Sequence, residues 1–121
     1  MRFASEKVGD VVVMSLEERR LDSRTVAEFR EAAREAFRDD CGFYVLDLSA
    51  VGFMDSAGVG ALVGLLKYLG RHRRLELCGL KPTVRKIFRL TRLEKVFTIR
   101  DSKEACIAAS RSLRSASRAR G

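Results

Sequence analysis

The hydrophobic pattern of the chain is organised around residues 44–66, YVLDLSAVGFMDSAGVGALVGLL. Its first residues, 44–48, are apolar except for one aspartate, which is typical of a strand buried on both faces. A short loop, residues 49–55, follows, and residues 57–66 carry no charge, which predicts a buried helix. The loop contains three apolar residues that we expect to point inward: Val51, Phe53 and Met54. The pattern therefore places one hydroxyl, that of Ser56, where the helix begins.

The residues before this stretch predict a hairpin and a helix. Residues 11–16, VVVMSL, are rich in β-branched side chains and predict a strand, and residues 8–10 predict a turn back to a first strand near Phe3. The hairpin follows because the chain leaves no room for a crossover helix. Thr25 and Glu28 form a T-x-x-E pattern that predicts a capping box at the start of the next helix. One face of that helix is apolar: Val26, Phe29, Ala33 and Phe37.

The uncharged helix contains three glycines, although each glycine weakens a helix by up to about 1 kcal/mol relative to alanine. Gly60 and Gly64 are four residues apart and predict close packing of the helix on the sheet. Gly58 lies beside Ser56, and it could instead keep that surface clear for a partner protein. The side chains expected to face the sheet are Val59, Leu62, Val63, Leu66 and Leu69.

The second half of the chain continues with alternating strands and helices. Strands are expected at residues 75–78 and 96–99, and helices from Lys81-Pro82 and from Asp101 or Ser102 to about Ser110. Parallel strands joined by helices, after an initial hairpin, imply an α/β fold with a mixed sheet and about four helices. The length of 121 residues fits one domain, which we assign to residues 1–110.

Cysteine usage indicates a reducing compartment. Cys41, Cys78 and Cys106 are odd in number and far apart, which favours free thiols over a disulfide or zinc framework. The first ten residues contain no apolar signal segment, and the longest uncharged run is too short to cross a bilayer. We therefore expect a cytoplasmic protein without a metal centre.

The net charge of +8 is concentrated toward the end of the chain. Residues 111–121 hold four arginines and no acid, so residues 1–110 carry 20 basic against 16 acidic side chains. With leucine as its one sizeable apolar residue, this basic tail is expected to be disordered. The tail is either a solvated terminus or a weak contact for nucleic acid or anionic lipid. In the second case residues 71–74, RHRR, would contribute to the same contact.

Ser56 lacks the neighbouring residues that a catalytic serine needs. His72 is the only histidine, and it lies sixteen residues beyond Ser56, past the far end of the same helix and roughly 20 Å away. Met54 stands where a nucleophile elbow requires glycine, and no glycine-rich phosphate loop occurs. A receiver domain is also disfavoured, because that fold requires a helix between its first two strands. We therefore expect a protein that is not an enzyme.

A plain structural role for Ser56 is to cap the helix through its side-chain oxygen. The surrounding sequence, however, resembles the STAS domain of bacterial anti-sigma factor antagonists, from about Val11 to about Ala109. The resemblance is carried by VLDLS, MDSAGVGAL and CGLKPTVRKIFRLTRLEKVF, together with the pair Leu21-Asp22. It implies a mixed sheet flanked by helices, in agreement with the pattern above.

The resemblance also implies a function and a set of partners. The serine matching Ser56 is phosphorylated by a partner that is both an anti-sigma factor and a serine kinase, and that partner supplies ATP and Mg²⁺. The unphosphorylated antagonist binds this partner and frees the sigma factor, the phosphorylated form releases it, and a phosphatase resets the cycle. No cofactor or specific nucleic acid is implied, and the protein is expected to be a monomer or a weak dimer. The residues implied in partner binding are Asp22, Asp55, Ser56, Ala57, Gly58 and Val59.

Two other functions remain open at this stage. A STAS domain can also serve as a scaffold or a transporter-associated regulator, as in stressosome or lipid-transport assemblies. A more distant alternative is a nucleic-acid or membrane-surface binder that uses the basic tail.

Overall fold

The computed structural model describes residues 1–38 and 42–120, with side chains up to residue 113. Its main sheet has five strands in the order β1-β2-β4-β6-β7. Strand β1 runs antiparallel to β2, and the other neighbouring strands are parallel. The strands are β1 (Phe3–Val8), β2 (Val11–Leu16), β4 (Phe43–Asp47), β6 (Arg74–Cys78) and β7 (Thr98–Arg100). The prediction of a mixed sheet with an N-terminal hairpin is confirmed.

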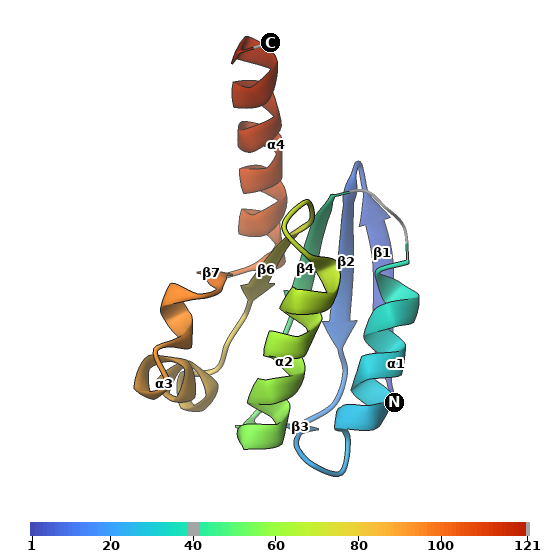
Figure 1. Ribbon diagram of the computed structural model, residues 1–121, viewed down its shortest axis with the longest axis vertical. Helices are drawn as coiled ribbons and strands as arrows, with labels where there is room; N and C mark the ends of the chain where they lie inside the picture. Colours follow the sequence, from blue (N-terminus) through green and yellow to red (C-terminus); the bar gives the residue numbers. More distant parts are fainter. Residues whose placement is uncertain (39–41, 121) are drawn as a thin grey trace.

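Helices cover both faces of this sheet (Figure 1). Helices α1 (Val26–Ala36), α2 (Ser56–Leu69) and α3 (Pro82–Leu90) pack on one face, and the first turns of α4 (Lys103–Arg120) pack on the other. A short 3₁₀ helix, η1 (Leu93–Lys95), leads into β7, which begins two residues later than the predicted strand. Among the described residues, no helix is both long enough and apolar enough to span a bilayer.

The alternation of side chains along β2 shows why the central strands are buried on both faces. Val12 and Met14 belong to the large core beneath α1, α2 and α3, whereas Val11 and Val13 belong to a smaller core beneath α4. Successive side chains of a strand point to opposite faces, so each central strand must be apolar at almost every position. The continuous apolar runs in the sequence follow from this arrangement.

Glu76, in β6, is a charged residue within this apolar interior. Its side chain is fully buried and accepts hydrogen bonds from Arg100 Nε at 2.6 Å and from Arg74 Nε at 2.8 Å. Burial by itself would raise the pKa of this carboxyl, but the hydrogen bonds and charges of Arg100 and Arg74 outweigh it and lower the pKa. Glu76 therefore links two strands through a buried carboxylate flanked by two guanidinium groups.

A second sheet of two short strands was not predicted. Strands β3 (Arg20–Leu21) and β5 (Phe53–Met54) pair in parallel. Met54 is buried, but Phe53 is 46% exposed, so the expectation that Phe53 points inward is wrong. Phe53 and Met54 are successive residues of one strand, and only one of them can face the core.

The inner face of α2 differs from the predicted one. The helix residues that are buried are Gly58, Ala61, Leu62, Leu65 and Leu69, while Val59, Val63 and Leu66 are half-buried. Gly60 and Gly64 are exposed, and a Cβ added at either position would meet no atom within 4 Å. The prediction that these two glycines pack closely on the sheet is therefore wrong. In a helix that is apolar on nearly all sides, hydrophobicity alone does not reveal which side faces inward.

The predicted capping box is also wrong, because Thr25 makes no side-chain capping bond to α1. The turn begins three residues earlier, at Asp22, whose Oδ1 accepts the N–H of Arg24 and whose own N–H donates to Thr25 Oγ1, both at 3.0 Å. The carbonyl of Asp22 also accepts the N–H of Val26. Glu28 instead pairs with the amino group of Met1 at 3.1 Å. Glu28, which the local pattern assigned to the cap, is thus engaged in a tertiary ion pair with the N-terminus.

Helix α4 continues through Arg120, with no break at the boundary predicted near residue 110 (Figure 1). Ser102 is the residue that caps it, since Ser102 Oγ accepts the N–H of Ala105 at 3.1 Å. The tail is rich in arginine and alanine, which favour helices, and it extends a helix already anchored by Cys106 and Ile107. Cys78 and Cys106 are buried free thiols, and Cys41 lies outside the described residues.

Candidate functional site

Ser56 is the first residue of α2, and its side chain is exposed. The helix is capped by Asp55, whose Oδ1 accepts the N–H of Gly58 at 3.0 Å. The plain reading of Ser56 as the capping residue is therefore wrong, because the capping position belongs to its neighbour. Within the described ranges, the Ser56 hydroxyl makes no hydrogen bond to the protein. The structure thus presents an unengaged hydroxyl at the surface.

Asp55 holds together the start of α2 and the loop before α1, which form the corner around Ser56. Besides capping α2, its Oδ2 accepts the N–H of Ser23 at 3.1 Å, so one carboxylate joins the start of α2 to the loop before α1. The Gly58 N–H, and less strongly the Ser23 N–H, hold the pKa of Asp55 below its ordinary value of 3.8. The residue beside Ser56 is therefore negatively charged at neutral pH.

Asp22 lies at the same corner. Leu21 pairs with Met54 across the small sheet, and the neighbouring Ser23 bonds to Asp55. Asp22 itself is buried, and its carboxylate serves the turn before α1 and lies 3.7 Å from the guanidinium of Arg20. Its visible role is to shape the loop that supports Asp55.

Gly58 has a packing reason to be glycine. It is buried, and an added Cβ would overlap the carbonyl oxygen of Leu21 and lie 2.8 Å from Met54 Cγ. The first turn of α2 thus rests directly on the backbone of β3. Of the other implied partner-binding residues, Ala57 and Val59 are half-buried, so each keeps part of its surface open to solvent.

Two further residues of this corner were missed at the sequence level. The Phe53 ring is 46% exposed, and the Arg20 guanidinium lies 4.6 Å from its centroid. A cation over an aromatic face contributes about 0.5–1 kcal/mol at exposed sites. No sequence signal reveals this pair, because it depends on the pairing of β3 with β5. It adds an aromatic and cationic surface to the carboxylate and hydroxyl of the corner.

The other sequence candidates lie away from this corner. His72 is exposed in the turn after the far end of α2, so the structure does not bring it to Ser56. Within residues 1–38 and 42–120, no group of three or more histidine, cysteine or acidic side chains could hold a metal ion.

Known proteins similar to this chain share both its sequence pattern and its fold. The sequence model of the STAS domain matches residues 2–106. The anti-sigma-B factor antagonist of Staphylococcus aureus (strain NCTC 8325 / PS 47) is 29% identical over 85 residues, which cover 69% of this chain and 79% of the relative.

Solved structures agree with this result. An anti-sigma factor antagonist from Mycobacterium paratuberculosis superposes with a TM-score of 0.82 at 26% identity, covering 91% of this chain and 93% of that one. The Bacillus protein SpoIIAA was solved in its phosphorylated form, with a TM-score of 0.64 at 28% identity and coverage of 89% and 99%.

The same protein, described as an anti-sigma factor antagonist, was also solved unphosphorylated. The family match spans every strand of the main sheet and the first turn of α4, and it includes the whole Ser56 corner. On these grounds the chain belongs to the STAS domain family.

Proposed function

We propose that this protein is a cytoplasmic anti-sigma factor antagonist that binds an anti-sigma factor with serine kinase activity. Phosphorylation of Ser56 by that partner, which holds the ATP and Mg²⁺, then breaks the complex, and a phosphatase restores it. The observation that carries the proposal is the exposed Ser56 hydroxyl, which the fold does not use because Asp55 caps the helix. A kinase can therefore reach this oxygen without unfolding the protein.

The electrostatics of the corner support a switch that acts at the interface. Phosphorylation adds about −1.5 to −2 charges beside the ionised Asp55. Asp55 already occupies the N–H of Gly58, so the helix start offers the phosphate one donor fewer than an uncapped helix would. In an interface, an unpaired desolvated charge weakens binding by about 2–5 kcal/mol, or roughly 30-fold to several thousand-fold. That range is sufficient for release without a change of fold.

The corner also supplies contact surface for the partner. Exposed Phe53, stacked with Arg20, resembles the aromatic and arginine anchors that dominate many protein interfaces. Ala57 and Val59 add apolar surface next to Ser56. An interface centred on these residues would bury the Ser56 oxygen. The loss of affinity on phosphorylation depends on that burial, because only a desolvated phosphate charge weakens binding by about 2–5 kcal/mol, or roughly 30-fold to several thousand-fold.

The test combines phosphate mapping with binding measurements. The protein is incubated with ATP, Mg²⁺ and each kinase-type anti-sigma factor of the same genome, and the adduct is mapped by mass spectrometry. We expect phosphate on Ser56, lost in Ser56→Ala and retained in Ser23→Ala, a control serine that is also exposed at this corner. Phosphate elsewhere, or on neither variant nor wild type, would contradict the proposal.

Binding to the same kinase then tests the switch. By isothermal titration calorimetry we expect Ser56→Ala to bind like wild type and Ser56→Asp to bind about 30-fold more weakly or worse. Ser5→Asp, which adds the same charge on the exposed edge strand β1, should bind like wild type. Equal affinities for Ser56→Ala and Ser56→Asp would refute the switch, and a stable large assembly on a sizing column would favour a scaffold instead.

A further inference from the structure

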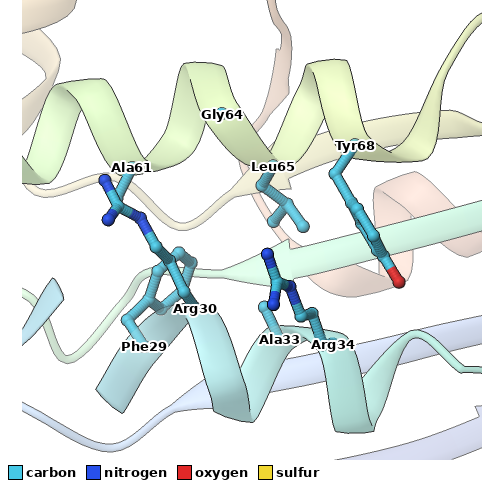
Figure 2. A pocket seen from close by; sticks show the side chains of 8 residues that line it. All are labelled: Phe29, Arg30, Ala33, Arg34, Ala61, Gly64, Leu65 and Tyr68. Carbon is cyan, nitrogen blue, oxygen red and sulfur yellow. The ribbon is translucent and has the colours of Figure 1, made fainter. Parts of the chain in front are cut away.

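A groove between α1 and α2 lies outside the Ser56 corner, with a cavity volume of about 300 Å³ (Figure 2). Its inner surface is apolar, since Phe29, Ala33, Ala61 and Leu65 are all buried. Its edges carry Arg30 and Arg34 from α1 and Gly64 and Tyr68 from α2. An apolar floor with cationic edges fits an occupant that is apolar on one side and acidic on the other.

The two arginines have no acidic partner in the part of the chain that the structure describes. Arg30 and Arg34 are one helical turn apart, and like charges at this spacing weaken a helix slightly. Neither forms an ion pair there, and the Arg34 guanidinium lies 5.4 Å from the centroid of the Tyr68 ring. Two arginines without an acidic partner among the described residues thus provide, at one groove edge, charge complementarity for carboxylates from outside the protein.

Of the two exposed glycines of α2, Gly64 lines the groove and Gly60 lies one helical turn earlier. Ser56, Gly60 and Gly64 are spaced four residues apart, so they lie on neighbouring sides of successive turns over about 12 Å. Both glycines are exposed with open space where a Cβ would be, so the fold of this chain does not require them. Their effect is to lower the surface of α2, which allows another helix to approach its backbone closely.

We propose that an amphipathic helix of the partner kinase lies along α2 from the Ser56 corner into this groove. Its apolar side packs over Gly60 and Gly64, and two acidic side chains one turn apart pair with Arg30 and Arg34. This inference rests on the proposed function, because it assigns a second contact surface to the same partner. A second copy of this chain is a poorer occupant, since a protein with a net charge of +8 would bring further cations to the arginines.

The test uses the kinase that phosphorylates Ser56 and measures its dissociation constant for unphosphorylated variants. Arg30→Glu with Arg34→Glu should weaken binding about 30-fold, because attraction becomes repulsion. Lys86→Glu with Arg89→Glu changes the charge equally on exposed positions of α3 and should leave affinity within about twofold. Comparable losses in both double variants would mean that only net charge matters, and would overturn the proposal.

A substitution at Gly64 separates binding from folding. Gly64→Leu places a side chain in open space on a helix, so the thermal midpoint should rise or stay the same while binding weakens about tenfold. Normal affinity in both Gly64→Leu and the arginine double variant, with Ser56 still phosphorylated, would overturn the groove proposal alone. If no kinase binds the wild-type protein, the proposed function fails and the groove proposal fails with it.

Discussion

Two glycines two residues apart in α2 should respond in opposite ways to the same added methyl group. At Gly58, the new Cβ would overlap the Leu21 carbonyl and crowd Met54 Cγ at 2.8 Å, so β3 or the first turn of α2 must shift. Overpacking of this kind destabilises by about 1–3 kcal/mol. The gain in helix propensity offsets at most about 1 kcal/mol of that. Gly58→Ala should therefore lower the free energy of unfolding by about 1–2 kcal/mol.

The same change at Gly60 supplies the matched control. Its Cβ meets nothing within 4 Å, so Gly60→Ala should keep the propensity gain and raise stability by about 0.5–1 kcal/mol. The two variants should then differ by about 1.5–3 kcal/mol, which is roughly 6–12 °C in thermal midpoint for a domain of this size.

Urea unfolding followed by circular dichroism measures this difference directly. The slope of the transition should be unchanged in both variants, so that the midpoints report stability alone. A Gly58→Ala protein as stable as Gly60→Ala would refute the packing of α2 against β3. It would also remove the structural reason for the position of Ser56, which lies two residues before Gly58.

Three further predictions concern other parts of the fold. Glu76→Gln should lower the free energy of unfolding by about 3 kcal/mol at neutral pH, because it leaves two guanidinium groups without their shared carboxylate. The folded-state pKa of Glu76 lies below its ordinary value of 4.5, so the stability of the wild type in urea should fall as the pH drops below about 4.5 and through that lower pKa. Glu76→Gln should lose less stability over the same pH range. Equal acid sensitivity of the two proteins would contradict the role given to the Glu76 carboxylate. Asp22→Ala should lower the free energy of unfolding, measured in urea, by about 1 kcal/mol, because it removes the acceptor of the Arg24 N–H in the turn before α1. An unchanged urea midpoint would show that this hydrogen bond is dispensable. Cys78 and Cys106 should resist thiol reagents at pH 8 until the protein unfolds, because both thiols are buried and the hydrogen bond with Cys106, together with burial, raises the pKa of Cys78. Rapid labelling of either cysteine in the folded protein, located by mass spectrometry, would refute this prediction.

Regular elements were predictable because their signals are local. The β-branched run of β2, the proline at the start of α3 and the uncharged stretch of α2 each determine the element to which they belong. The order of these elements was then sufficient for a mixed sheet with a parallel core. The sequence also located Ser56 at a helix start, since an acid, a small residue and a long apolar run meet there.

Only the tertiary structure decided which side of each element faces the protein and which neighbour takes each polar group. Asp55 rather than Ser56 caps α2, and the same carboxylate also accepts the N–H of Ser23, thirty-two residues earlier. Glycines at 58, 60 and 64 are alike in sequence, but β3 packs against the first of them, whereas no described atom lies within 4 Å of a Cβ added at the other two. Short-range patterns record propensity and hydrophobicity, whereas these assignments depend on contacts between residues distant along the chain.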